Sequence, residues 1–357
     1  MDIADYDYDL PEDRIAQVPV EPRDSARLLV DAGNRIDHRH VRDLVEALGP
    51  DDLVVINQTR VLPARLHLVK DTGGAAEVLL LEERPEIGAG SWEALVRPGR
   101  RLPPGTVLRS AGHPEVLTVD VGEPLGDDGR RSVVLHTDHP GGLEAAVQAF
   151  GEIPLPPYIH EALVDPDRYQ TVYAERDRAE SVAAPTAGLH LTPDVLSQIT
   201  ARGVGLDRVE LAVGLGTFRP ITADRVEDHQ MHAERYQVSE ATLAACRETR
   251  RRGGRVTAIG TTTVRALESV AASGQLEGRT DLFIHPGFEF QLVDQLMTNF
   301  HQPRSSLLVM IDAFVGSNPD GSPHWRDLYR EALARDYRFL SFGDAMFLTR
   351  HDRWDRP

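Results

Sequence analysis

Cysteine is almost absent from this chain of 357 residues, which contains only Cys246. A single cysteine excludes a framework of internal disulfides and is typical of a reducing compartment. Long apolar runs are also missing: the stretch SSLLVMIDAFVG is interrupted by Asp312 and is too short to span a bilayer. The amino terminus, MDIADYDYDLPEDR, is acidic and lacks the pattern of a secretion signal. We therefore expect a soluble, cytoplasmic protein without a membrane span.

Positive charge is scarce, because 39 Lys and Arg face 56 Asp and Glu and leave a net charge of −17. Phosphate binding depends on Lys and Arg, so this balance argues against a nucleic-acid partner at first sight. Total charge is, however, a poor guide to one local face. Arginines gather in RETRRRGGR (247–255) and in RPGRR (97–101). Taken alone, each cluster is better explained as a solvated element end; in RETRRRGGR the cations would suit the carboxyl end of a helix.

The pattern of predicted elements changes twice along the chain. Helix-like VRDLVEALG (41–49) and strand-like LVVI (53–56) come first. From about residue 70 to 139, short strand-like runs alternate with glycine- and proline-rich turns, as in a small antiparallel barrel. Beyond GGLEAAVQAFG, the strand-like runs RVELAV, RVTAIG and DLFIH alternate with helix-like segments. We predict a mixed α/β domain (1–70 and 140–357) with an inserted antiparallel β-barrel domain (71–139).

Three loops are rich in small residues: SVAAPTAGLH (181–190), GLGTF (214–218) and GTTTVR (260–265). Small residues let the backbone approach a ligand, and Gly188 permits a geometry that other residues resist. The third loop is a strand-to-helix turn that could receive a polar or anionic group, or its threonines could only cap the helix. None matches a phosphate loop or a dinucleotide fingerprint. Together the loops indicate a site for a nucleoside-sized ligand.

Two histidines adjoin such loops. His190 follows Gly188 and could transfer a proton near neutral pH, or could cap the helix that starts at Thr192. Asn299-Phe-His301 could hold a ligand or tie down a turn. The glycine-rich context favours the site for His190, whereas the two alternatives for Asn299 and His301 stay open.

The segment EDHQMH (227–232) is the best candidate for a metal site, because His229 and His232 lie three residues apart. A metal site normally draws ligands from more than one element, and no second His/Cys cluster is evident, so we expect no metal. Arg60 and Arg65 flank a proline beyond a buried strand, where one could pair with a carboxylate or phosphate.

At this point the motifs resemble one family. In chain order they are YDLPEDRIAQ, EPRDSARLL, NQTRVLPARL, GEIPLPPYI, SVAAPTAGLH, VGLGTF, EDHQMH, AIGTTTVRALE, FIHPGFEF, LMTNFHQPRSSLL and YRFLSFGDAMFL. From Tyr8 to Leu348 the chain is similar to the S-adenosylmethionine:tRNA ribosyltransferase-isomerases of queuosine synthesis. The resemblance implies an α/β fold with a small β-barrel, and no metal or further cofactor, because S-adenosylmethionine is a co-substrate.

The resemblance also implies a reaction. S-adenosylmethionine donates its ribose to 7-aminomethyl-7-deazaguanine at the wobble position of tRNAs with GUN anticodons, which gives epoxyqueuosine and releases adenine and methionine. The sulfonium acidifies the adjoining 5′ carbon, so the protein must supply a base, a proton donor for adenine and a water-poor pocket.

Candidate residues for each task follow from the motifs. Proton transfer is assigned to His190, His232, His301 and Asp228, with Glu210 in reserve. Contacts to S-adenosylmethionine are assigned to Thr186, Gly188, Gly216, Thr217, Thr261, Thr262, Thr263 and Asn299. RNA contacts are assigned to Arg60, Arg65, Arg251 and Arg252.

Without the resemblance, three other classes would stay open: a metal-dependent hydrolase using His229 and His232, an ordinary methyltransferase, and a non-catalytic RNA-binding module. The number of small-residue loops favours an enzyme over a binding module. Among enzymes, the resemblance favours ribosyl transfer.

Overall fold

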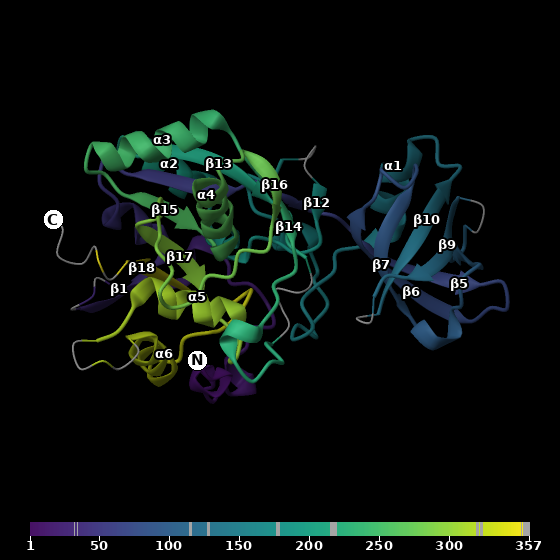
Figure 1. The fold of residues 1–357 in the computed structure, drawn as a ribbon, viewed down its shortest axis with the longest axis horizontal. Coiled ribbons are helices and arrows are strands. Elements are labelled where there is room, and N and C mark those ends of the chain that lie inside the picture. The colour runs from purple at the N-terminus through teal and green to yellow at the C-terminus, as the bar shows by residue number, and fades with distance from the viewer. Residues whose placement is uncertain are drawn as a thin grey trace. The chain divides into compact units, whose positions relative to one another are not determined.

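The computed structural model describes residues 1–31, 33, 35–113, 116–126, 129–175, 179–214, 220–318, 321, 324–350 and 352. The chain divides into two compact units (Figure 1). The first comprises Met1–Arg60, Pro156–Arg178 and Ala184–Pro357. The second comprises Val61–Leu155 and Ala179–Ala183.

The first unit is built on a nine-stranded mixed sheet. In spatial order its strands are β16 (Glu277–Thr280), β14 (Glu234–Val238), β13 (Gly205–Leu211), β3 (Leu53–Asn57), β15 (Val256–Ile259), β17 (Gln295–Asn299), β18 (Ala345–Thr349), β1 (Arg27–Asp31) and β2 (Ile36–His40). The central strands β13, β3, β15 and β17 are parallel to one another. Their carboxyl ends therefore lie at one edge of the sheet, where open α/β sheets bind ligands.

Helices cover both faces of this sheet. The α-helices of the first unit are α2 (Pro193–Ala201), α3 (Glu240–Arg251), α4 (Thr261–Ser273), α5 (Ser306–Val315) and α6 (His324–Ala334). Side chains alternate along β3, so Val54 and Ile56 share a core with Val195 of α2, while Asn57 points to the other face and bonds Thr262 of α4. The sheet is thus buried between helical layers.

Short 3₁₀ helices complete this unit: η1 (Ile3–Tyr6), η2 (Glu12–Arg14), η3 (Arg23–Ser25), η4 (Val41–Ala47), η6 (Pro166–Tyr169), η8 (Thr186–His190) and η10 (Val226–Asp228). Side-chain caps start several of the longer helices. Ser305 Oγ accepts the Leu308 N–H of α5 at 3.2 Å, and Thr192 Oγ1 accepts the Val195 N–H of α2 at 3.2 Å. Gly260, with φ of 90°, makes the turn from β15 into α4.

The second unit contains a closed six-stranded antiparallel barrel. Its order is β5 (Arg65–Lys70), β6 (Ala75–Glu83), β7 (Ser91–Arg97), β10 (Arg130–Thr137), β9 (Leu117–Pro124) and β8 (Thr106–Ser110), and β8 pairs back to β5. Further elements of the chain around it are β11 (Gly151–Glu152), α1 (Gly142–Phe150), η5 (Gly99–Arg101) and the pair β4 (Arg60–Val61) with β12 (Ala179–Ser181). Leu117, Val119 and Val121 of β9 are buried in turn, so the alternate residues fill the barrel.

The structure confirms the predicted mixed α/β fold with a β-barrel. The barrel unit is wider than the predicted 71–139, because β5 is one of its strands and α1 packs on β10. Where an α-helix was predicted over 41–49, Val41–Ala47 form the 3₁₀ helix η4. Within the described ranges, no helix is long and apolar enough to cross a membrane.

The segment DLFIH (281–285) is not a strand, contrary to the sequence prediction. The strand β16 precedes it, and the carbonyls around its start are used elsewhere: the Arg265 guanidinium donates to Thr280 O and to Leu282 O, each at 3.2 Å. A buried cation therefore replaces a neighbouring strand as the partner of this backbone.

Candidate active site

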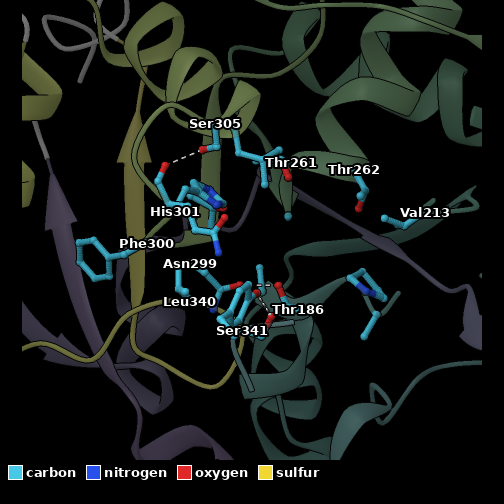
Figure 2. Close-up of a pocket in the computed structure, with 18 residues that line it drawn as sticks. Thr186, Val213, Thr261, Thr262, Asn299, Phe300, His301, Ser305, Leu340 and Ser341 are labelled. Atoms are coloured by element: carbon cyan, nitrogen blue, oxygen red, sulfur yellow. Dashed lines mark hydrogen bonds between the residues drawn. The ribbon is translucent and has the colours of Figure 1, made fainter. Parts of the chain in front are cut away.

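A pocket of about 610 Å³, counting its open mouth, lies where the central strands of the first unit end. Apolar walls come from residues such as Val213, Phe300 and Leu340. Its polar side chains are Tyr158, Thr186, Thr261, Thr262, Thr298, Asn299, His301, Gln302, Ser305 and Ser341 (Figure 2). No carboxylate, lysine or arginine lines it among the described residues.

Asn299, the last residue of β17, bonds two residues of the small-residue loop 181–190. Thr186 Oγ1 donates to Asn299 Oδ1 at 2.8 Å (Figure 2). Asn299 Nδ2 in turn donates to His190 Nε2 at 3.1 Å. An amide nitrogen only donates, so His190 Nε2 accepts and its proton resides on Nδ1. This chain of bonds fixes the amide orientation and the histidine tautomer together.

His190 lies behind Asn299 and does not line the main pocket. It faces a smaller cavity with Arg23 and Arg168. Burial, together with Arg338, Arg23 and Arg168, lowers the pKa of His190 to about 3. Its imidazole is therefore neutral near pH 7 and acts on the pocket through Asn299.

His301 lines the pocket directly and differs in that respect from His190. Its Nε2 lies 2.9 Å from Thr298 Oγ1. Among the described residues, nothing hydrogen-bonds to Nδ1, which leaves that nitrogen for a ligand. Burial lowers the pKa of His301 to about 3, so this ring is also neutral near pH 7.

The GTTTVR motif presents two of its three hydroxyl residues to the pocket. Thr261 and Thr262 line it, and Thr262 Oγ1 accepts from Asn57 Nδ2 at 3.2 Å. Thr263 is turned away, because its hydroxyl donates at 2.7 Å to the carbonyl of Ile259, the last residue of β15. Successive helical residues point about 100° apart, so three in a row cannot face one ligand. Thr263 is thus corrected to a structural residue.

Gly188 does not line the pocket; close packing explains why a residue without a side chain stands here. A Cβ at this position would lie 1.8 Å from Tyr173 Oη. The atom that lies close to this position is thus a protein hydroxyl and not a ligand. Gly216 and Thr217 lie outside the described residues.

Several residues of the pocket lining are not among the candidates that the motifs suggested. Tyr158 Oη and Ser341 Oγ are 2.7 Å apart at the pocket wall, although 183 positions separate them. Ser305 also lines the pocket and caps α5. Each stands in a motif that carried the family resemblance, which was the available signal for them.

The EDHQMH segment does not join this pocket. Asp228 and His232, which the motifs assigned to proton transfer, are exposed and absent from its lining, so the structure does not place them at this pocket. His229 packs against Phe283 instead of a ligand cluster. Glu210 accepts from Gln58 Nε2 at 2.9 Å. In the part of the chain that the structure describes, no group of three His, Cys, Asp or Glu could hold a metal.

The arginines assigned to RNA are scattered. Arg251 and Arg252 both contact Glu248 at the end of α3, just before β15 begins, so they lie at the edge of the sheet opposite the pocket. Arg60 is 3.8 Å from Asp167 in the first unit, and Arg65 is 3.3 Å from Glu77 in the second. The structure does not bring the four together within one unit.

A buried ion pair supports the loop that enters the pocket after β13. Arg265 of α4 donates to Glu234 of β14, and Glu234 accepts the Gly214 N–H at 3.0 Å. Both charged side chains are nearly inaccessible. The arginine of GTTTVR therefore fixes the backbone next to Val213, a pocket residue.

Fold and pocket together define an α/β enzyme with an inserted β-barrel and an uncharged polar site at the strand ends. The family model described as "Queuosine biosynthesis protein" matches residues 3–348. Proteins named S-adenosylmethionine:tRNA ribosyltransferase-isomerase are similar: that of Thermotoga petrophila is 46% identical (98% of this chain, 100% of the relative), and that of Symbiobacterium thermophilum is 48% identical (98% and 100%). The chain belongs to the queuosine biosynthesis protein family.

A solved structure agrees with this membership. The crystal structure of S-adenosylmethionine tRNA ribosyltransferase from Thermotoga maritima is 36% identical, with a TM-score of 0.52. The match covers 96% of this chain and 99% of the other. The fold of the present chain is therefore that of a family member over nearly its whole length.

Proposed function

We propose that this protein transfers and isomerises the ribosyl group of S-adenosylmethionine onto 7-aminomethyl-7-deazaguanine in tRNA. The acceptor base occupies the wobble position of GUN anticodons, the product is epoxyqueuosine, and adenine and methionine leave. The observation that carries the proposal is the full-length similarity to ribosyltransferase-isomerases. The pocket adds support, because residues of the motifs shared with that family build it.

The charge of the pocket suits a sulfonium substrate. His190 and His301 have a pKa lowered to about 3, so neither carries a positive charge that would repel the cationic sulfur. A water-poor site also strengthens each hydrogen bond to the ribose and the adenine. Thr186, Thr261, Thr262 and Asn299 supply those hydrogen bonds in the proposed complex.

Within this proposal, His301 is the proton-transfer residue and His190 is a positioning residue. His301 lines the pocket with Nδ1 available, and His190 reaches it only through Asn299. In the proposed reaction the ring proton of His301 lies on Nε2 toward Thr298, so the lone pair of Nδ1 takes the 5′ proton that the sulfonium acidifies. The imidazolium then hands this proton to the departing adenine.

The test uses the full chain with S-adenosylmethionine and a tRNA that carries 7-aminomethyl-7-deazaguanine. We expect adenine release that requires this tRNA, a mass gain of one epoxycyclopentane unit on the modified base, and methyl label that stays on methionine. A tRNA with guanine at the same position is the control and should release no adenine. Methyl label on the RNA would instead mark a methyltransferase, and absence of both products would contradict the proposal.

A further inference from the structure

The amino-terminal segment, residues 1–8, contacts the loop that carries His301. Figure 1 shows the chain's beginning beside α6, and Tyr6 stacks on Trp325 of that helix with ring centres 6.1 Å apart. Tyr8 packs edge-on against Tyr329, also of α6, at 5.1 Å. The segment is therefore anchored on a layer of aromatic rings.

The main-chain carbonyl and the main-chain N–H of His301 each form a hydrogen bond with a tyrosine hydroxyl. Tyr8 Oη donates to the His301 carbonyl, and the His301 N–H donates to Tyr329 Oη at 2.9 Å. Burial raises the pKa of Tyr8 well above its usual range, so its hydroxyl stays protonated and able to donate. A buried peptide group with both partners present has a defined orientation.

The same segment holds the next turn of that loop. The Arg304 N–H donates to Tyr6 O at 2.9 Å, and Arg304 Nε donates to Asp7 Oδ2 at 2.8 Å. The loop is therefore anchored at His301 and again at Arg304. His301 and its neighbour Gln302 line the pocket. The loop is thus held at both ends by residues 1–8.

We infer that Tyr8 and Tyr329 are positioning residues that set the direction of the His301 imidazole by clamping its peptide groups. This inference rests on the role proposed above for His301. It gives a task to the YDLPEDRIAQ motif, which contributes no side chain to the pocket wall among the described residues. The chain's first residues are by this account part of the construction of the active site.

The test compares Tyr8→Phe with Tyr6→Phe. Tyr8→Phe keeps the ring contacts and removes only the hydroxyl on His301, whereas Tyr6→Phe removes a hydroxyl of the same segment that bonds Asp312 at 2.7 Å. Misplacing a reacting group by about 1 Å can cost up to about a hundredfold, so we expect Tyr8→Phe to lower kcat about tenfold. KM for S-adenosylmethionine should change less than about twofold, as for a loss confined to the transition state. Tyr6→Phe keeps the ring stacking on Trp325 and the main-chain bond from Arg304 to Tyr6 O, so it should leave kcat and KM unchanged.

A double variant separates positioning from general support of the fold. If Tyr8 acts through the His301 ring, Tyr8→Phe in a His301→Gln background should slow turnover no further. Full additivity, or an unchanged kcat in Tyr8→Phe, would overturn the inference. Should Tyr8→Phe not fold, Tyr329→Phe tests the other half of the clamp against the same criteria.

A second readout does not depend on the reaction. In protein labelled with ¹⁵N-histidine, the His301 ring signals, assigned by their absence in His301→Gln, should shift in Tyr8→Phe and stay in place in Tyr6→Phe. Unshifted signals in Tyr8→Phe would refute the clamp even in an active enzyme. A wild-type protein that releases no adenine would refute the proposed function, while these signals would still decide about the clamp.

Discussion

The two edges of the nine-stranded sheet have opposite chemistry. At the carboxyl edge, hydroxyls, an amide and a neutral imidazole line a pocket, and their hydrogen bonds connect distant motifs. At the amino edge, arginines lie beside carboxylates: exposed Arg251 on Glu248, and half-buried Arg255 on buried Asp52 at 2.9 Å. The strands are shared, yet one edge is arranged to receive a ligand and the other to neutralise its own charge.

The difference shows which polar residues are informative. A surface ion pair is screened by water and contributes little, so many alternative placements would serve equally well. A buried amide such as Asn299 must satisfy every donor and acceptor, which allows few arrangements. Chemistry at the carboxyl edge should therefore be sensitive to single atoms, and the amino edge should tolerate substitution.

The largest expected effect concerns His301 at the carboxyl edge. His301→Gln keeps the size and polarity of the side chain but removes proton transfer, so turnover should fall by about a hundredfold or more. Adenine release under saturating substrates measures it. The Tm should stay close to that of the wild type, because the ring bonds only Thr298 among the described side chains. Full turnover in this variant would exclude His301 as the proton-transfer residue.

Gly188 tests packing behind the same edge. Gly188→Ala places a methyl group 1.8 Å from Tyr173 Oη, which requires backbone or ring displacement and should cost about 3 kcal/mol of unfolding free energy. Urea unfolding measures the loss. Gly49→Ala is the matched control near the amino edge, where the new methyl would meet Asp52 Oδ2 at an ordinary 3.5 Å. Equal stability of the two variants would contradict the comparison.

Acid should weaken the carboxyl edge before the main carboxylates titrate. The pKa of His190 and of His301 is about 3 in the folded protein, below the unfolded value of about 6.5. Below pH 6.5 the unfolded chain therefore binds protons that the folded chain does not. The free energy of unfolding thus decreases as the pH is lowered. Each histidine should remove about 2 kcal/mol between pH 7.5 and 5.

Urea unfolding at several pH values measures this slope. His190→Gln and His301→Gln should each flatten it, whereas a change at exposed His232 should leave it as in the wild type. A slope that is identical in all the variants would show that these two rings are not neutral and buried in the native protein.

The smallest effect is expected at the amino edge. The double variant Arg251→Ala and Arg252→Ala removes side chains that contact Glu248 in solvent, so Tm and tRNA-dependent turnover should not change measurably. The salt dependence of tRNA affinity is the sharper measure. In a plot of the logarithm of the binding constant against the logarithm of the salt concentration, each phosphate contact adds about one to the size of the slope. A slope that is smaller by one or two in the double variant than in the wild type would show that these arginines contact the RNA.

Much of the carboxyl edge could be predicted from the sequence. Small residues and threonines that follow buried strands indicate loops at strand ends, and Thr186, Thr261, Asn299 and His301 indeed line one pocket. The alternation of elements likewise predicted the α/β layer and the barrel. Local patterns determine these features, since strand direction and loop position follow from the order of elements.

Other features depend on contacts between distant positions. That His190 lies behind Asn299 follows from a hydrogen bond across 109 positions, and the Tyr158–Ser341 pair spans 183. Arg251 and Arg252 attract attention by their number, yet their edge of the sheet is set by the direction of β15. No periodicity encodes such relations, so the sequence could name these residues but not place them.

The most direct test of the account is the affinity for S-adenosylmethionine measured by calorimetry in variants of both edges. Asn299→Ala removes the amide that joins Thr186 to His190, and should weaken binding about tenfold or more, equivalent to about 1.4 kcal/mol. The double variant Arg251→Ala and Arg252→Ala should bind as the wild type does. Unchanged binding by Asn299→Ala, or a loss confined to the arginine variant, would contradict the placement of the active site at the carboxyl edge.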